Sequence, residues 1–175
     1  MQSGATFRLA AHAEASGELC VLKEEHSNTT VFFAEEYATA EQAAEYLSRR
    51  LAAAVFALHI HDGDLWMYVL YHKGAVVDQF NPIPDYWDDS LSEQEAADWQ
   101  GSAATIAAYV PTVQAPDVAN YLVRWDPDAH QPAKAYATDE YGPEEWQLLD
   151  FMRRLQLPNP VTAEGLDGEL YRLGR

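Results

Sequence analysis

The fold is decided by the stretch 55–80, which reads VFALHIHDGDLWMYVLYHKGAVVDQF. Three runs rich in β-branched and aromatic residues, 55–61, 65–72 and 75–80, are separated by the pairs Asp62-Gly63 and Lys73-Gly74. Asp-Gly is a strong hairpin signal, because a type I′ turn needs positive φ at both central positions. Strands joined by such tight turns are antiparallel. The stretch therefore predicts a three-stranded antiparallel meander.

Upstream of this meander, the sequence predicts three further strands and one helix. The strands are expected over 6–13, 19–25 and 30–34. Apolar residues recur with period two in the first, β-branched and aromatic residues fill the last, and turn-forming residues separate the three. We expect these three strands to form a second meander. Residues 40–53 then carry an apolar stripe at helical spacing, and Thr39 and Gln42 form a capping box at its start.

Downstream of Phe80 the pattern indicates helices. Ser92 and Glu95 form a capping box for a helix running toward residue 100, and further helices are expected over 103–110, from 116 to 125, and from 143 until Pro158. The expected fold class is α+β: an antiparallel β-sheet of two three-stranded meanders, with helices packed mainly on one face. We expect residues 1–175 to form a single domain.

The composition is strongly acidic. The chain has 28 Asp and Glu residues against 11 Lys and Arg, and its formal net charge is −17. Such a charge repels nucleic-acid phosphates and anionic membrane surfaces, so we expect neither as a partner. The single cysteine, Cys20, fits a reducing compartment, and residues 1–4 lack the pattern of a signal peptide. A cytoplasmic protein is therefore expected.

The negative charge is unevenly distributed along the chain. No Lys or Arg occurs between Lys73 and Arg124, and a second acidic run spans 126–150. Three explanations stay open. The acids form a surface for a basic protein partner, they serve solubility or salt adaptation, or they only cover solvated helix faces.

One candidate metal site lies at the first hairpin. His59 and His61 point to the same face of their strand, and Asp64 follows the turn. Imidazole and carboxylate ligands suit a divalent transition metal such as Zn²⁺, Fe²⁺ or Mn²⁺. The alternative is that these side chains are simply solvated at the hairpin end. A true metal site needs a third or fourth convergent ligand with supporting groups around it.

A candidate partner-binding surface lies in the loop 81–89, NPIPDYWDD. Two prolines stiffen this loop, and its candidate residues are Asp85, Tyr86, Trp87, Asp88 and Asp89. Rigid aromatic side chains are typical of binding hot spots. The alternative is that Trp87 fills the core where the chain leaves the sheet.

The sequence favours binding over catalysis. It has no phosphate-binding loop, no dinucleotide-binding glycine motif and no serine-hydrolase or zinc-protease motif, so we assign no catalytic residue and expect no cofactor other than a metal at the histidines. We expect a small acidic cytoplasmic interaction protein, in its most specific form an inhibitor or immunity-like protein for a basic partner. The alternative is a metal-dependent enzyme or small-ligand-binding protein that uses the His59/His61/Asp64 corner.

Overall fold

The computed structural model describes residues 6–9, 19–33, 37–63, 65–87, 90–126, 133–162 and 165–174. The chain forms two compact units. The terminal unit combines Met1–Thr39 with Gln156–Arg175, and the central unit comprises Ala40–Leu155. Each unit is described separately below, and the expectation of a single domain stays a prediction. Among the described residues, no helix is long and apolar enough to cross a membrane.

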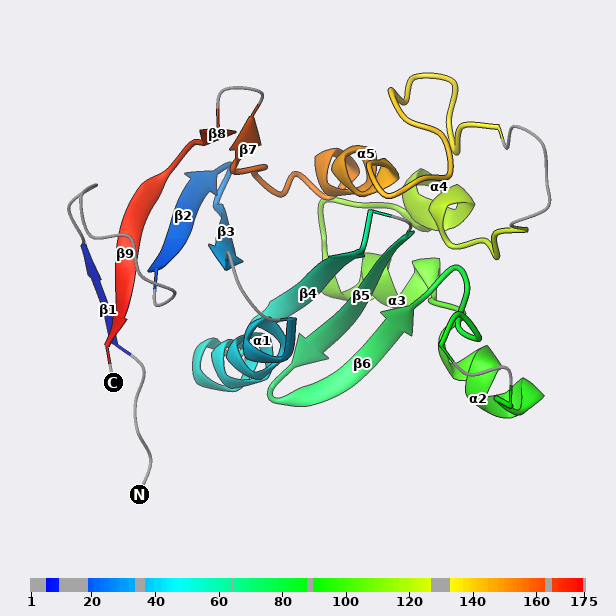
Figure 1. The fold of residues 1–175 in the computed structure, drawn as a ribbon, viewed down its shortest axis with the longest axis horizontal. Helices are drawn as coiled ribbons and strands as arrows, with labels where there is room; N and C mark the ends of the chain where they lie inside the picture. Colours follow the sequence, from blue (N-terminus) through cyan, green and yellow to red (C-terminus); the bar gives the residue numbers. More distant parts are fainter. Residues whose placement is uncertain are drawn as a thin grey trace. The chain divides into compact units, whose positions relative to one another are not determined.

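The central unit is built on the meander that the stretch 55–80 predicts. Strands β4 (Ala54–His61), β5 (Leu65–His72) and β6 (Ala75–Phe80) lie side by side in that order and are antiparallel (Figure 1). Both turns have positive φ at each central residue, 50° and 77° at Asp62 and Gly63, and 52° and 79° at Lys73 and Gly74. The turn geometry required by the sequence is thus confirmed, and the middle strand β5 is almost wholly buried.

Helices follow the strands in the central unit and also precede them. Their bounds are α1 (Tyr37–Leu51), α2 (Glu93–Asp98), α3 (Ala103–Tyr109), α4 (Ala115–Val118) with a 3₁₀ turn at Ala119–Tyr121, and α5 (Gln147–Arg154). The capping box of Ser92 and Glu95 is present at the start of α2. Helix α1 begins before Thr39, so the prediction that Thr39 caps this helix is wrong. The helical segment after Pro116 ends at Tyr121, before the predicted Trp125, and α5 begins four residues after Pro143.

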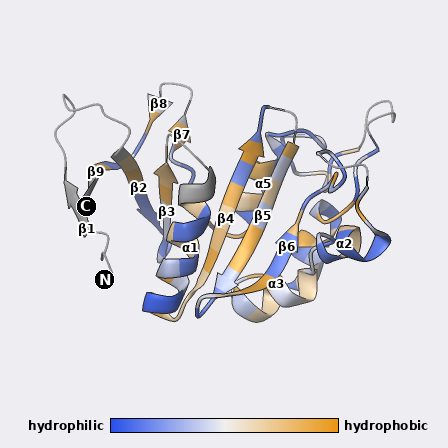
Figure 2. Ribbon diagram, turned by 60° about the horizontal axis from the view of Figure 1, so that its bottom comes forward, coloured by the Kyte–Doolittle hydropathy of each residue, from blue (hydrophilic) through white to orange (hydrophobic). Residues whose placement is uncertain are grey.

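The two faces of the central sheet are covered by different elements. On one face, Tyr68 stacks on Phe151 of α5 with ring centroids 5.6 Å apart, and Tyr121 also contacts Phe151. On the other face, Ala57 and Val69 pack with Ala44 of α1. Figure 2 shows apolar residues concentrated in β4 and β5, whereas α2 is mainly hydrophilic. The α+β class is therefore confirmed.

The terminal unit contains a four-stranded antiparallel sheet in the order β1-β9-β2-β3. Its strands are β1 (Thr6–Leu9), β2 (Leu19–Glu25), β3 (Asn28–Phe33) and β9 (Glu169–Gly174), and a small hairpin pairs β7 (Val161–Thr162) with β8 (Gly165–Leu166). The three N-terminal strands are present, but they do not pair as one meander, because β9 lies between β1 and β2. Cys20 is buried, as expected for a small apolar side chain, and burial raises the pKa of its thiol.

Candidate functional site

The loop that leaves β6 is closed at its base by backbone hydrogen bonds. The amide of Asn81 donates to the carbonyl oxygen of Trp99 at 3.0 Å, and Phe80 forms an antiparallel bridge with Gln100. The amide of Trp125 donates to the carbonyl oxygen of Pro82 at 3.1 Å. These bonds fix the chain just before Ile83 and just after α2, and the predicted Asp85, Tyr86 and Trp87 lie between them in sequence.

The two regions singled out in the sequence meet at an aromatic cluster. We call His61, Tyr86 and Trp87 the aromatic cluster. The ring centroids of His61 and Trp87 are 4.8 Å apart, those of His61 and Tyr86 5.6 Å, and those of Tyr86 and Trp87 5.1 Å, all in edge-to-face geometry. The indole Nε1–H of Trp87 donates to Nε2 of His61 at 3.2 Å. The histidine of β4 thus fixes the orientation of the loop tryptophan.

The cluster is presented to solvent. Trp87 is 52% exposed and Tyr86 is 41% exposed. The alternative in which Trp87 fills the core is therefore wrong, because about half of its side chain stays exposed. Asp85 is exposed beside these rings, whereas Asp88 and Asp89 lie outside the described residues.

The predicted metal ligands are only partly described. The rings of His59 and His61 lie on one face with centroids 5.9 Å apart, as strand periodicity requires, and Asp64 lies outside the described residues. Nε2 of His61 already accepts the Trp87 hydrogen bond. Burial lowers the pKa of His59, repulsion from His61 lowers it further when that ring is protonated, and the negative charge of Asp62 opposes both. Within the described part of the chain, no three His, Cys, Asp or Glu side chains are grouped to hold a metal, and the metal site stays a prediction.

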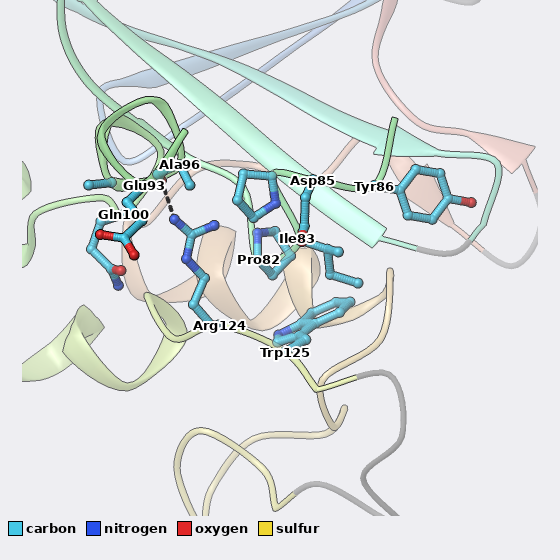
Figure 3. A pocket seen from close by; sticks show the side chains of 11 residues that line it. Pro82, Ile83, Asp85, Tyr86, Glu93, Ala96, Gln100, Arg124 and Trp125 are labelled. Atoms are coloured by element: carbon cyan, nitrogen blue, oxygen red, sulfur yellow. Dashed lines mark hydrogen bonds between the residues drawn. The ribbon is translucent and has the colours of Figure 1, made fainter. Parts of the chain in front are cut away.

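An open cleft of about 690 Å³ lies next to the aromatic cluster and shares Tyr86 with it (Figure 3). Its lining combines apolar and charged side chains from the loop, from α2 and from the chain near residue 125: Pro82, Ile83, Pro84, Asp85, Tyr86, Glu93, Ala96, Ala97, Gln100, Arg124 and Trp125. The cleft and the cluster therefore form one continuous surface of the central unit.

Arg124 connects the walls of this cleft. One guanidinium nitrogen, Nη1, donates to the carbonyl oxygen of Asn81 at 3.2 Å. The other, Nη2, donates to the carbonyl oxygen of Ala96 in α2, as the dashed line in Figure 3 shows. Burial lowers the pKa of Arg124, and the negative charge of Asp85 acts in the opposite direction. Because an arginine stays charged in proteins, these two bonds are charge-assisted and stabilise the relative position of loop and helix.

The acidic residues divide into internal and exposed groups. The carboxylate of Asp150 accepts the backbone amides of Glu140 and Tyr141, and the carboxylate of Asp139 accepts Arg154 and the hydroxyl of Tyr121. Both aspartates are buried. By contrast, α2 buries none of its residues and exposes Glu93, Glu95 and Asp98. The exposed charge that can meet a partner at this surface is thus concentrated on α2 and Asp85.

Sequence reasoning missed the cleft and the role of Arg124. Arg124 is the first basic residue after a long segment without Lys or Arg, and this was the only local signal that it could have a structural role. Its partners are main-chain carbonyls that are 43 and 28 residues away in sequence, and no periodicity indicates such bonds.

Comparison of the chain with protein-family models, with curated proteins and with solved structures finds no match.

Proposed function

We propose that this protein binds a basic protein partner through its central unit. The binding surface, here called the acidic-aromatic face, consists of Asp85, Tyr86, Trp87 and the exposed helix α2. The observation that carries the proposal is the pair Tyr86 and Trp87, which packs against His61 and yet is about half exposed. Exposed large aromatic side chains that adjoin a cleft are typical of interaction sites.

The restraint on Trp87 favours tight binding. A side chain that is already ordered loses little conformational entropy when a partner covers it. The hydrogen bond from Trp87 to His61 and the edge-to-face contacts of the cluster supply that order before binding. Burial of the remaining exposed ring surface then makes the free energy of binding more favourable, at a small cost in side-chain conformational entropy.

The charge of the face favours a basic partner. Asp85 directly precedes the aromatic pair, and Glu93, Glu95 and Asp98 are exposed on α2, which lines the same cleft as Tyr86. Arg124, the cation that lines this cleft, is bonded to main-chain carbonyls. Complementary charges increase the rate of association and exclude acidic partners. In its most specific form, the proposal is a cytoplasmic inhibitor or immunity-like protein that covers a functional surface of its basic target.

Site-specific photo-crosslinking tests the proposal. A photoreactive phenylalanine analogue replaces Trp87 in one variant and Trp146 in the control, because Trp146 is a 41% exposed tryptophan of the same unit. The full chain is expressed in the cells that produce it and irradiated at low and at high salt. We expect position 87 to capture a basic protein, and we expect the yield to fall as salt rises.

Comparison of the crosslinking yields at positions 87 and 146 shows whether a captured protein binds at the proposed face. Capture of the same basic protein at position 146 with equal yield would overturn the proposed face. Capture of acidic proteins only, or of none at position 87 at low salt, would overturn the proposed class of partner.

A further inference from the structure

We propose that the cleft beside the aromatic cluster receives an arginine side chain of the partner. This inference rests on the proposed function and names the group that the partner inserts. The open cleft, of about 690 Å³, is lined by Tyr86, whose ring contacts Trp87, so the cleft adjoins the proposed binding surface. Clefts that adjoin exposed aromatic rings commonly accept the anchoring side chain of a binding partner.

The apolar lining suits the flat guanidinium and its aliphatic stem. Ile83 and Trp125 lie close together on one side of the cleft, with Pro82 next to Ile83 (Figure 3), and Pro84 also lines the cleft. A guanidinium group stacks on aromatic faces and is weakly hydrated, whereas the ammonium group of lysine is a compact and strongly hydrated charge. The stem of an arginine can therefore lie along the partly exposed Ile83 while its head group contacts a ring.

The charged lining also favours a cation. Two carboxylates, Asp85 and Glu93, line the cleft against one cation, Arg124. The guanidinium of Arg124 donates to the carbonyl oxygens of Asn81 and Ala96, which holds it in the wall. The lining thus keeps a net negative charge, and a carboxylate can accept two parallel hydrogen bonds from an incoming guanidinium.

Trp125 provides a local reporter of occupancy. Its indole Nε1 is buried and has no hydrogen-bond partner among the described residues, while its ring lines the cleft. A guanidinium that stacks in the cleft changes the chemical environment of this ring. The Nε1–H resonance of Trp125 should therefore shift when the cleft is filled.

A titration with short peptides tests the inference on the full chain. The probes are N-acetylated, C-amidated tetraarginine, tetralysine and tetracitrulline, of which citrulline has the shape of arginine without its charge. The five tryptophan indole resonances are assigned by single Trp→Phe variants and followed by ¹H–¹⁵N spectroscopy. We expect tetraarginine to shift Trp125 in a saturable way, with binding about tenfold tighter than tetracitrulline, because ion pairing and cation–π attraction are both lost with the charge.

Three variants distinguish a site in the cleft from general attraction to an acidic surface. Asp85→Asn and Glu93→Gln should each weaken tetraarginine binding about fivefold, since each removes one partly exposed ion pair. The control Glu144→Gln removes an exposed carboxylate that does not line the cleft and should leave the affinity within about twofold.

The outcomes separate this inference from the proposed function. Equal binding of tetralysine and tetraarginine would overturn the preference for arginine. An equal effect of all three variants, or an unshifted Trp125, would overturn the cleft as the site. Either result leaves crosslinking at position 87 as an independent test of partner binding, and absence of that crosslink would overturn the proposed function even if tetraarginine fills the cleft.

Discussion

Removal of the Asp150 carboxylate should destabilise the fold, because this acidic residue is part of the internal hydrogen-bond network. Oδ2 of Asp150 accepts the amides of Glu140 and Tyr141 at 2.9 and 2.8 Å, and Oδ1 accepts Arg153 at 2.6 Å. The side chain of Asp150 is wholly buried, whereas that of Arg153 is largely exposed. The carboxylate therefore attaches the segment before α5 to the helix itself.

The expected cost follows from these three bonds. Each amide bond to a charged acceptor contributes about 1.5–3 kcal/mol, and the exposed arginine adds at most about 1 kcal/mol, so Asp150→Ala should lower the free energy of unfolding by at least about 3 kcal/mol. Asp150→Asn keeps an oxygen acceptor and should cost about half as much. With a urea slope of about 2 kcal/mol per molar, the alanine variant should unfold at a urea concentration lower by at least about 1.5 M.

Urea unfolding followed by circular dichroism measures these differences, with Glu144→Ala as the matched control. Glu144 is an exposed acid near the same helix and should change the free energy of unfolding by no more than about 0.5 kcal/mol. If Asp150→Ala cost no more than the control, the carboxylate would be an ordinary surface charge. The division of the acids into internal and exposed groups would then be wrong.

Two further predictions concern the support of the site. Gly101 has φ of 70°, and an added Cβ would lie 3.1 Å from the Tyr68 hydroxyl, whereas nothing lies within 4 Å at Gly63 with φ of 77°. Gly101→Ala should therefore destabilise the protein by at least about 1 kcal/mol more than Gly63→Ala in urea unfolding, and equal losses would contradict the close packing. Burial raises the pKa of Asp78, although its hydrogen bonds with Tyr68 and two backbone amides oppose this. Because the folded state then holds this proton more tightly than the unfolded state, the protein should lose stability relative to Asp78→Asn as pH rises from about 4 through the raised pKa. A relative gain in stability over that range would contradict a raised pKa of Asp78.

The central meander could be predicted because its determinants are local. Asp62-Gly63 and Lys73-Gly74 require positive φ, and the strands between these turns extend as far as their β-branched and aromatic runs. The position of β9 between β1 and β2 could not be predicted in the same way. Its pairing joins residues at opposite ends of the chain, and no turn residue specifies such a register.

The sequence predicted which residues belong to the candidate site, but it did not predict how they are arranged. The prolines and aromatic residues of 81–89 indicated a rigid loop, but the exposure of Trp87 and its contact with His61 depend on segments that lie apart in sequence, which no local pattern specifies. The contact between Trp87 and His61 joins two regions that the sequence presented as separate candidates. Only the folded chain brings the hairpin end to the loop.

The most direct test of the account is the affinity of the captured basic partner for three forms of the protein. Calorimetry at about 0.05 M and about 0.3 M salt would compare the natural sequence with Trp87→Ala and with the control Trp146→Ala. We predict that Trp87→Ala weakens binding about 30-fold or more, as loss of a hot-spot tryptophan does, that Trp146→Ala stays within about twofold, and that the higher salt weakens binding. Equal losses from the two tryptophan substitutions, or binding that is insensitive to salt, would contradict a basic partner at the acidic-aromatic face.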